Sequence, residues 1–127
     1  MDDLKDLLLN PWTFLPIGYV FTILIETPIL CVGLSGEHSQ KRRVLAGCWL
    51  TACTYPIVVL VLPAAIHDYG IYLAAAETFA PVGECALFWI AFAPLKQPVR
   101  DMLAIIFANL ASFGIGIGMQ YALGLIG

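Results

Sequence analysis

Charged side chains are scarce in this chain. Asp, Glu, Lys and Arg together make up 12% of its 127 residues, whereas 61% of the residues are hydrophobic. A soluble domain ordinarily carries about 25% charged residues. The composition therefore excludes an ordinary water-soluble domain and indicates a chain whose main solvent is lipid.

Signatures of several function classes are also missing from the sequence. It contains no HExxH zinc pair and no nucleophile elbow, and His38 and His67 are its only histidines. The glycines near the C-terminal end lie inside an apolar run with no strand before it, so they do not form a phosphate-binding loop. No segment combines aromatic and basic residues as a nucleic-acid-binding surface would. We therefore expect a protein that is not an enzyme and does not bind nucleic acid, with an intramembrane enzyme as the less favoured alternative.

The four cysteines, Cys31, Cys48, Cys53 and Cys85, form no CxxC pair and none falls in a predicted loop. This spacing does not predict a disulfide framework. We interpret them as small apolar residues, the usual role of a buried free cysteine. Thiol–metal or redox chemistry is the less favoured alternative.

Four apolar stretches are long enough to cross a bilayer as helices, which takes roughly 20 residues each. They cover about residues 15–34, 44–63, 69–92 and 102–126. Because the connections are short, neighbouring helices must be antiparallel. The sequence predicts an all-α integral membrane protein with a single transmembrane domain, 1–127, built as two antiparallel helical hairpins.

The chain begins MDDLKD, which is acidic, whereas a secretory signal begins with a basic region. We expect residues 1–12 to form a short segment at the membrane interface instead.

Basic residues are distributed unevenly along the chain. Lys41, Arg42 and Arg43 lie before the second span, Lys96 and Arg100 lie before the fourth, and the connection between the second and third spans has none. The positive-inside rule then places both basic segments in the cytoplasm and both termini outside. The expected location is the inner, or plasma, membrane of a bacterium, with bilayer lipid around the chain.

A shift of 58 residues aligns the first half of the sequence with the second. Glu26 then falls on Glu84 and Thr54 on Ser112, so that acid matches acid and hydroxyl matches hydroxyl. The two halves would be parallel repeats, related by a pseudo-twofold axis along the membrane normal. Coincidence is the alternative explanation, because the identity between the halves is low.

Three glutamates, Glu26, Glu77 and Glu84, lie inside the predicted spans, and no base does. An acidic charge at the centre of a membrane helix costs about 2.5–3.5 kcal/mol on insertion scales. Protonating a glutamate of ordinary pKa, about 4.3, costs about 3.7 kcal/mol at pH 7. Because the two costs are close, a neighbouring group decides whether such a side chain is charged. A group with that balance is suited to binding a proton or a cation.

Neutral oxygen ligands are predicted beside these acids. Thr54, Asn109 and Ser112 fall near the middle of their spans, and prolines inside three of the four spans would each leave a backbone carbonyl free nearby. Clusters that are rich in oxygen and free of bases suit protons and hard cations. No organic cofactor is predicted, and a bound cation or a lipid is the ligand left open.

The fourth span carries a small-residue face made of Gly114, Gly116 and Gly118, which would let another helix approach closely. Four helices make a thin wall for a solute pathway, so we expect assembly as a homo-oligomer through these glycines or association with a partner in a membrane complex.

The favoured hypothesis is a small membrane protein that moves protons or cations, or is coupled to them. Glu26 and Glu84 would form the midplane site and Glu77 an outer relay. Two alternatives stay open at this point. The glutamates could be protonated hydrogen-bonding residues that join helices, or the chain could be a non-catalytic subunit of a larger complex, its acids contacting partner helices, pigment or lipid.

Overall fold

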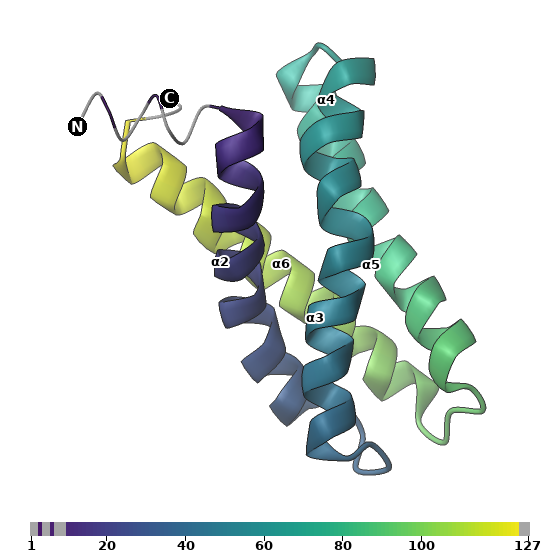
Figure 1. The fold of residues 1–127 in the computed structure, drawn as a ribbon. Coiled ribbons are helices and arrows are strands. Elements are labelled where there is room, and N and C mark those ends of the chain that lie inside the picture. The colour runs from purple at the N-terminus through teal and green to yellow at the C-terminus, as the bar shows by residue number, and fades with distance from the viewer. Residues whose placement is uncertain (1–2, 4–5, 7–9, 125–127) are drawn as a thin grey trace.

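The structure is a computed structural model, and it describes residues 3, 6 and 10–124 (Figure 1). All regular elements in the longer of these stretches are helical. They are α2 (Pro11–Gly33), α3 (Gln40–Pro56), the π-helix η1 (Ile57–Val61), α4 (Leu62–Ala65), α5 (Tyr69–Phe92) and α6 (Pro98–Ala122). The predicted all-α fold is confirmed. The interfacial segment predicted over residues 1–12 lies largely outside the described residues.

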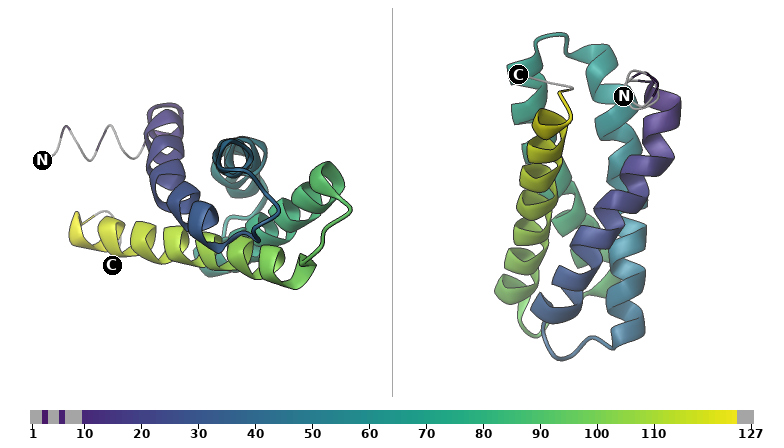
Figure 2. Two further views of the ribbon diagram at one scale, coloured as in Figure 1. Left: turned by 90° about the horizontal axis from the view of Figure 1, so that it is seen from below. Right: turned by 90° about the vertical axis from the view of Figure 1, so that its left-hand side faces the viewer.

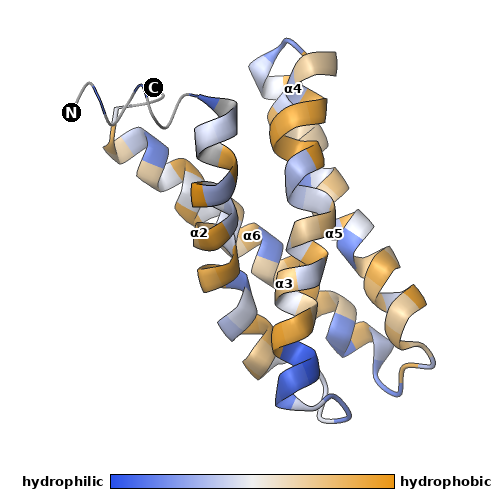
Figure 3. Cartoon of the chain, in the orientation of Figure 1, coloured by the Kyte–Doolittle hydropathy of each residue, from blue (hydrophilic) through white to orange (hydrophobic). Residues whose placement is uncertain are grey.

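Within the described residues, four helical stretches are long and apolar enough to cross a membrane, which confirms the predicted number of spans. They are Leu15–Gly33, Gln40–Ala65, Tyr69–Phe92 and Pro98–Ala122. The second stretch runs from α3 through η1 to α4. Hydrophobic residues extend along these helices, whereas a hydrophilic group gathers at the first turns of α3 (Figure 3).

Three helices begin about one turn earlier than the hydropathy pattern predicts, α2 at Pro11, α3 at Gln40 and α6 at Pro98. Ser39 caps α3, because its side chain accepts the backbone N–H of Arg42 at 3.2 Å. Proline suits the first position of α6, where its missing N–H has no helical partner to lose. The basic residues used to predict orientation therefore lie in helical first turns, with the exception of Lys96.

Proline changes the geometry of the second span. Helix α3 ends at Pro56, which has no N–H to give to the carbonyl of Ala52, and the next five residues form η1. The hydroxyl of Tyr72 on α5 donates to the carbonyl of Val58 within η1 at 2.8 Å. A neighbouring helix thus satisfies one carbonyl of this irregular turn, as a protein in lipid requires.

The four spans form a ring. Helices α2 and α5 each pack against both α3 and α6, and within the described part of the chain no Cα atoms of the diagonal pairs α2–α5 and α3–α6 lie within 8 Å of each other. The view from below in Figure 2 shows this arrangement around a common centre. Helix α2 begins and α6 ends at the same end of the bundle as α4 (Figure 1).

The apolar core occupies the half of the bundle, along its axis, that lies nearer the connections 34–39 and 93–97. All four spans contribute to it, with Leu30, Leu34, Ala46, Leu50, Phe88, Ala104, Ile105 and Ala108. The other half of the bundle, toward α4, surrounds a cavity.

Helix bounds repeat at the interval of 58 residues that relates the two halves of the sequence. Adding 58 to Pro11 and Gln40 gives Tyr69 and Pro98, the first residues of α5 and α6. Core positions follow the same interval in three pairs: Leu30 and Phe88, Ala46 and Ala104, Leu50 and Ala108. The structural interval thus matches the one read from the sequence.

Helices α2 and α3 approach each other closely at Gly47 of α3, which the sequence analysis did not single out. A Cβ atom at Gly47 would lie 3.2 Å from the Cα of Thr27 on α2 and would overlap the Thr27 hydroxyl. By contrast, a Cβ atom at Gly114 or Gly118 would meet nothing within 4 Å in the described structure. These two glycines leave open space on α6, so their role in packing against another chain stays a prediction.

Replacing Gly47 by alanine should destabilise the fold, because the added methyl group meets the backbone of α2. Overpacking of this kind typically costs about 1–3 kcal/mol. The matched control is Gly118→Ala, which should raise the free energy of unfolding by about 0.5–1 kcal/mol, since alanine favours the helix over glycine. Equilibrium unfolding in mixed micelles would measure both. Equal stability of Gly47→Ala and the parent protein would disprove the close contact.

Candidate functional site

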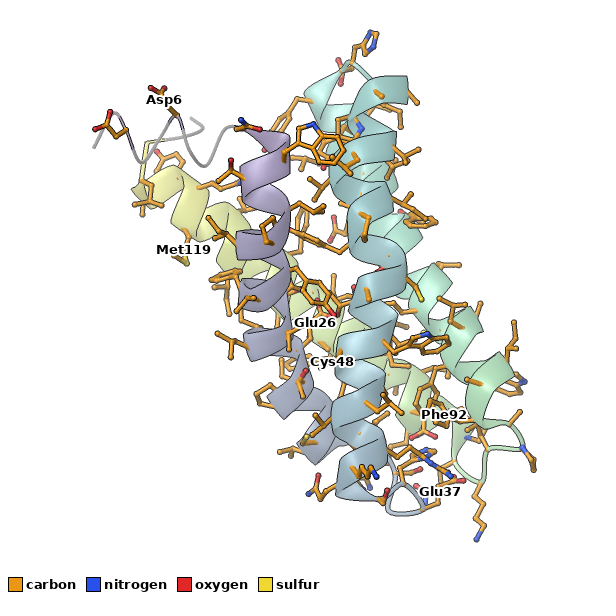
Figure 4. The ribbon with its side chains drawn as sticks, in the orientation of Figure 1. Asp6, Glu26, Glu37, Cys48, Phe92 and Met119 are labelled. Carbon is orange, nitrogen blue, oxygen red and sulfur yellow. The ribbon has the colours of Figure 1, made fainter. Side chains whose placement is uncertain are left out.

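A cavity of about 330 Å³ lies inside the ring of spans. Glu26 and Glu84 line its inner part, and Ile17, Tyr69 and Leu123 line the part toward the end where α2 begins. Figure 4 shows Glu26 about midway along α2, well away from Glu37 in the connection at the far end. The cavity therefore runs from the middle of the spans toward the α4 end of the bundle.

Each of the two buried glutamates accepts a hydrogen bond from a hydroxyl group on another span. Ser112 of α6 donates to Glu26 Oε2 at 2.6 Å, and Thr54 of α3 donates to Glu84 Oε2 at 3.1 Å. The two glutamates are only 2% and 3% exposed. These bonds repeat at the same interval of 58 residues, because Glu84 is equivalent to Glu26 and Ser112 to Thr54.

Both hydroxyl groups also lie within hydrogen-bonding distance of a backbone carbonyl. Thr54 Oγ1 is 3.1 Å from the carbonyl oxygen of Leu50, and Ser112 Oγ is 3.1 Å from that of Asn109. A hydroxyl has one hydrogen to donate and can accept another. Each glutamate therefore has a partner that can either donate to it or accept from it.

The other predicted ligands take different positions around the cavity. Asn109 is buried and lines the cavity, and its side-chain amide donates to the carbonyl of Ile105 at 2.9 Å. Glu77 also lines the cavity, two helical turns from Glu84, but its side chain is exposed. Of the three glycines predicted for helix packing, Gly116 lines the cavity. The six residues predicted to bind a proton or a cation thus all line one cavity. Glu77 differs from Glu26 and Glu84 because it is exposed, whereas they are buried.

A second buried polar cluster, which the sequence analysis missed, lies at the opposite end of the bundle. Asp101 in the first turn of α6 is fully buried. It accepts the backbone N–H of Ser35 at 2.8 Å and pairs with Nε2 of His38 at 3.0 Å. An Asp in a first helical turn is common as a favourable charge near the helix N-terminus, so the sequence carried no distinct signal for this contact.

Arg43 completes the closure of this end of the bundle. Its guanidinium donates to the backbone carbonyls of Cys31, Ser35 and His38, at 2.6, 2.9 and 3.0 Å. The residue predicted as an orientation signal thus also caps the end of α2 and holds the connection 34–39. Arg100 adds a bond to the last residue of the same helix, from Nε to a carbonyl at 3.1 Å.

Glu37 joins the two connections at this end, because its Oε2 accepts the backbone N–H of Lys96 at 2.8 Å. Glu37, His38 and Asp101 each place one ligand atom within 4.8 Å of the other two. His38 and Asp101 already bond to each other, and the Arg43 cation bonds the carbonyl of His38. We interpret the cluster as a structural latch between the two connections.

Comparison with protein-family models finds no match, and comparisons with curated proteins and with solved structures find none either. The structure itself defines the class. Over its described residues, the chain is an all-helical protein with four helices long and apolar enough to span a membrane, arranged around a cavity that buried carboxyl groups line.

Replacing Asp101 by alanine should lower the free energy of unfolding strongly. The substitution leaves the N–H of Ser35 and the ring of His38 without their acceptor, and each orphaned buried donor costs about 1–3 kcal/mol. Asp101→Asn, which keeps one carbonyl acceptor, should lose less. The matched control is Asp68→Asn at an exposed helix cap, which should unfold like the parent protein. Equal stability of Asp101→Ala and Asp68→Asn would contradict the latch.

Proposed function

We propose that this protein moves protons or small cations across a membrane, or is coupled to their movement, through Glu26 and Glu84. The observation that carries the proposal is the pair of carboxyl–hydroxyl contacts inside a cavity whose lining, among the described residues, includes no Lys, Arg or His. Without a fixed positive charge beside them, the carboxyl groups are free to take a proton or a cation from the cavity.

The hydroxyl partners support exchange because they suit both forms of the acid. When a carboxylate is charged, Thr54 or Ser112 donates to it. When it is protonated, its O–H donates a hydrogen bond to the hydroxyl oxygen, and the hydroxyl donates its own hydrogen to the carbonyl within reach, at 3.1 Å in both cases. The heavy atoms need not move. A cation beside the carboxylate would stabilise the charged form, and its departure would favour the protonated one.

Glu77 fits the role of an outer relay in this proposal. It lines the cavity on the α4 side of Glu84 and is exposed, so it can exchange with the medium at that end. Asn109 would supply a further polar side chain near the buried pair.

We further propose that the chain is a duplicated antiparallel hairpin inserted with both termini outside. The shared interval of helix starts, core positions and carboxyl–hydroxyl pairs supports the duplication. The basic residues near α3 and α6 all lie at the end opposite α4, and the positive-inside rule places that end in the cytoplasm of a plasma membrane. The cavity would then open toward the outside.

Assembly with a second chain is part of the proposal. Gly114 and Gly118 leave open space on α6, which allows a helix of another chain to approach closely. The same space favours the competing function, a non-catalytic subunit of a larger membrane complex. Such a subunit would be inert alone and would copurify with its partner.

Proton flux into liposomes containing the purified protein should depend on the two buried acids. An imposed potassium gradient with valinomycin would drive flux, and an entrapped pH-sensitive dye would report it. Glu26→Gln and Glu84→Gln should each reduce the rate at least about tenfold, because an amide cannot take up and release the proton. Glu77→Gln should cause a smaller reduction.

The control is Glu37→Gln, since Glu37 does not line the cavity and glutamine keeps a carbonyl acceptor for Lys96. This variant should transport like the parent protein. Flux that is absent from the parent protein for protons, Na⁺ and K⁺ alike, or that survives in both buried-acid variants, would refute the proposal and favour the accessory subunit.

Thiol labelling would check the proposed orientation. In a chain whose four cysteines are replaced by alanine, single cysteines can be introduced by Gly36→Cys and by His67→Cys, both at exposed positions. A membrane-impermeant maleimide added to intact cells should label the second variant and should label the first only after lysis. The reverse pattern would overturn the N-out, C-out orientation.

A further inference from the structure

The cavity is much larger than a proton or a dehydrated metal ion requires. A water molecule occupies about 30 Å³ of liquid volume, and the cavity measures about 330 Å³. Cavities of about 300–1,000 Å³ are those that ordinarily hold small organic molecules. The size therefore suits an organic ligand.

Aromatic rings from all four spans line the cavity. They belong to Phe21, Tyr55, Tyr69, Tyr72 and Phe113. The ring of Tyr72 is held in place by its hydrogen bond to Val58, and the ring centroid of Tyr69 lies 6.2 Å away. The face of an aromatic ring attracts a cation, so this wall can bind a positively charged group together with its apolar substituents.

The charges on the cavity wall all have one sign. Glu26, Glu77 and Glu84 line the cavity, and no basic side chain from the described part of the chain does. Thr51 adds an independent feature, because this residue lines the cavity, is 2% exposed, and has a buried hydroxyl with no hydrogen-bond partner among the described residues. An unpaired buried hydroxyl is costly, and a polar ligand group would remove that cost.

The part of the cavity toward α4 does not suit Ca²⁺ or Mg²⁺. Ca²⁺ takes six to eight oxygen ligands at about 2.3–2.6 Å, and Mg²⁺ demands an octahedral set. Most side chains lining the part of the cavity toward α4 are aliphatic or aromatic, among them Ile17, Leu73 and Ile117. These side chains cannot supply such a shell, whereas they can pack against hydrocarbon.

We propose that the cavity is a binding site for an organic monocation that carries apolar substituents, of the quaternary ammonium or arylalkylamine class. The positive nitrogen would lie near Glu26 and Glu84, and the substituents would lie against the aromatic wall. This inference rests on the proposed function, since the same two acids would exchange the organic cation for a proton. Binding one monocation and releasing one proton leaves the charge of the site unchanged.

Isothermal titration of the purified full-length protein with benzyltrimethylammonium tests the site, with protein-free micelles as the blank. The cation should bind and should release a proton, seen as a binding enthalpy that changes with the ionisation enthalpy of the buffer. Glu26→Gln and Glu84→Gln should each raise Kd at least about tenfold. Neopentylbenzene, in which carbon replaces the ammonium nitrogen, should bind more weakly than the cation.

Two substitutions at Tyr55 test whether its aromatic ring contributes to binding of the cation. Tyr55→Phe keeps the ring and should leave Kd within about threefold of the parent value. Tyr55→Leu removes it and should raise Kd between about twofold and thirtyfold, the span of a cation–π contact from exposed to desolvated. Trp89→Leu, an aromatic substitution outside the cavity lining, is the matched control and should leave Kd unchanged.

The possible results distinguish this inference from the function on which it rests. Equal affinity for the cation and its neutral isostere, or unchanged Kd in both glutamine variants, would overturn the organic-cation site. Flux of protons or K⁺ that depends on Glu26 and Glu84, with no binding or inhibition by benzyltrimethylammonium, would overturn the inference alone. Binding that depends on both acids, in a protein that moves nothing, would support the site and refute the transport function.

Discussion

The arrangement of this bundle depends on one constraint: a carboxyl group buried within a membrane helix needs a polar partner inside the protein, because lipid offers none. Glu26 meets Ser112, and Glu84 meets Thr54, each across a boundary between the two halves of the chain. These contacts join α2 to α6 and α5 to α3. They therefore fix how each helix is rotated about its axis, and with that rotation which side chains line the central cavity.

The two halves of the bundle along its axis serve different purposes. At one end, the apolar core, the latch of Glu37, His38 and Asp101, and the bonds of Arg43 hold the helix ends and connections together. Toward the α4 end the ring surrounds a cavity that its side chains leave unfilled. Packing at the first end allows the second to stay hollow, since one well-packed half is enough to set the position of all four spans.

The sequence predicted the residues of the cavity but not those of the second buried polar cluster. Acids inside apolar runs stand out because each carries an energetic penalty that needs a reason, and the structure places Glu26 and Glu84 at one cavity with Thr54 and Ser112. Asp101 gave no such signal, because an acid at a helix start is ordinary. Its burial results from the connection 34–39 folding over it, a long-range contact that local patterns do not encode.

Length and hydropathy alone determined that the chain is helical with four spans, because a bilayer accepts only segments that satisfy their own backbone and are apolar over roughly 20 residues. The interval of 58 residues was also present in the sequence. Tertiary structure decided which face of each helix points inward, how closely α3 approaches α2 at Gly47, and which rings line the cavity. The reason is that these spans are apolar on nearly every side, so no amphipathic stripe marks an inner face, and only contacts between helices select one.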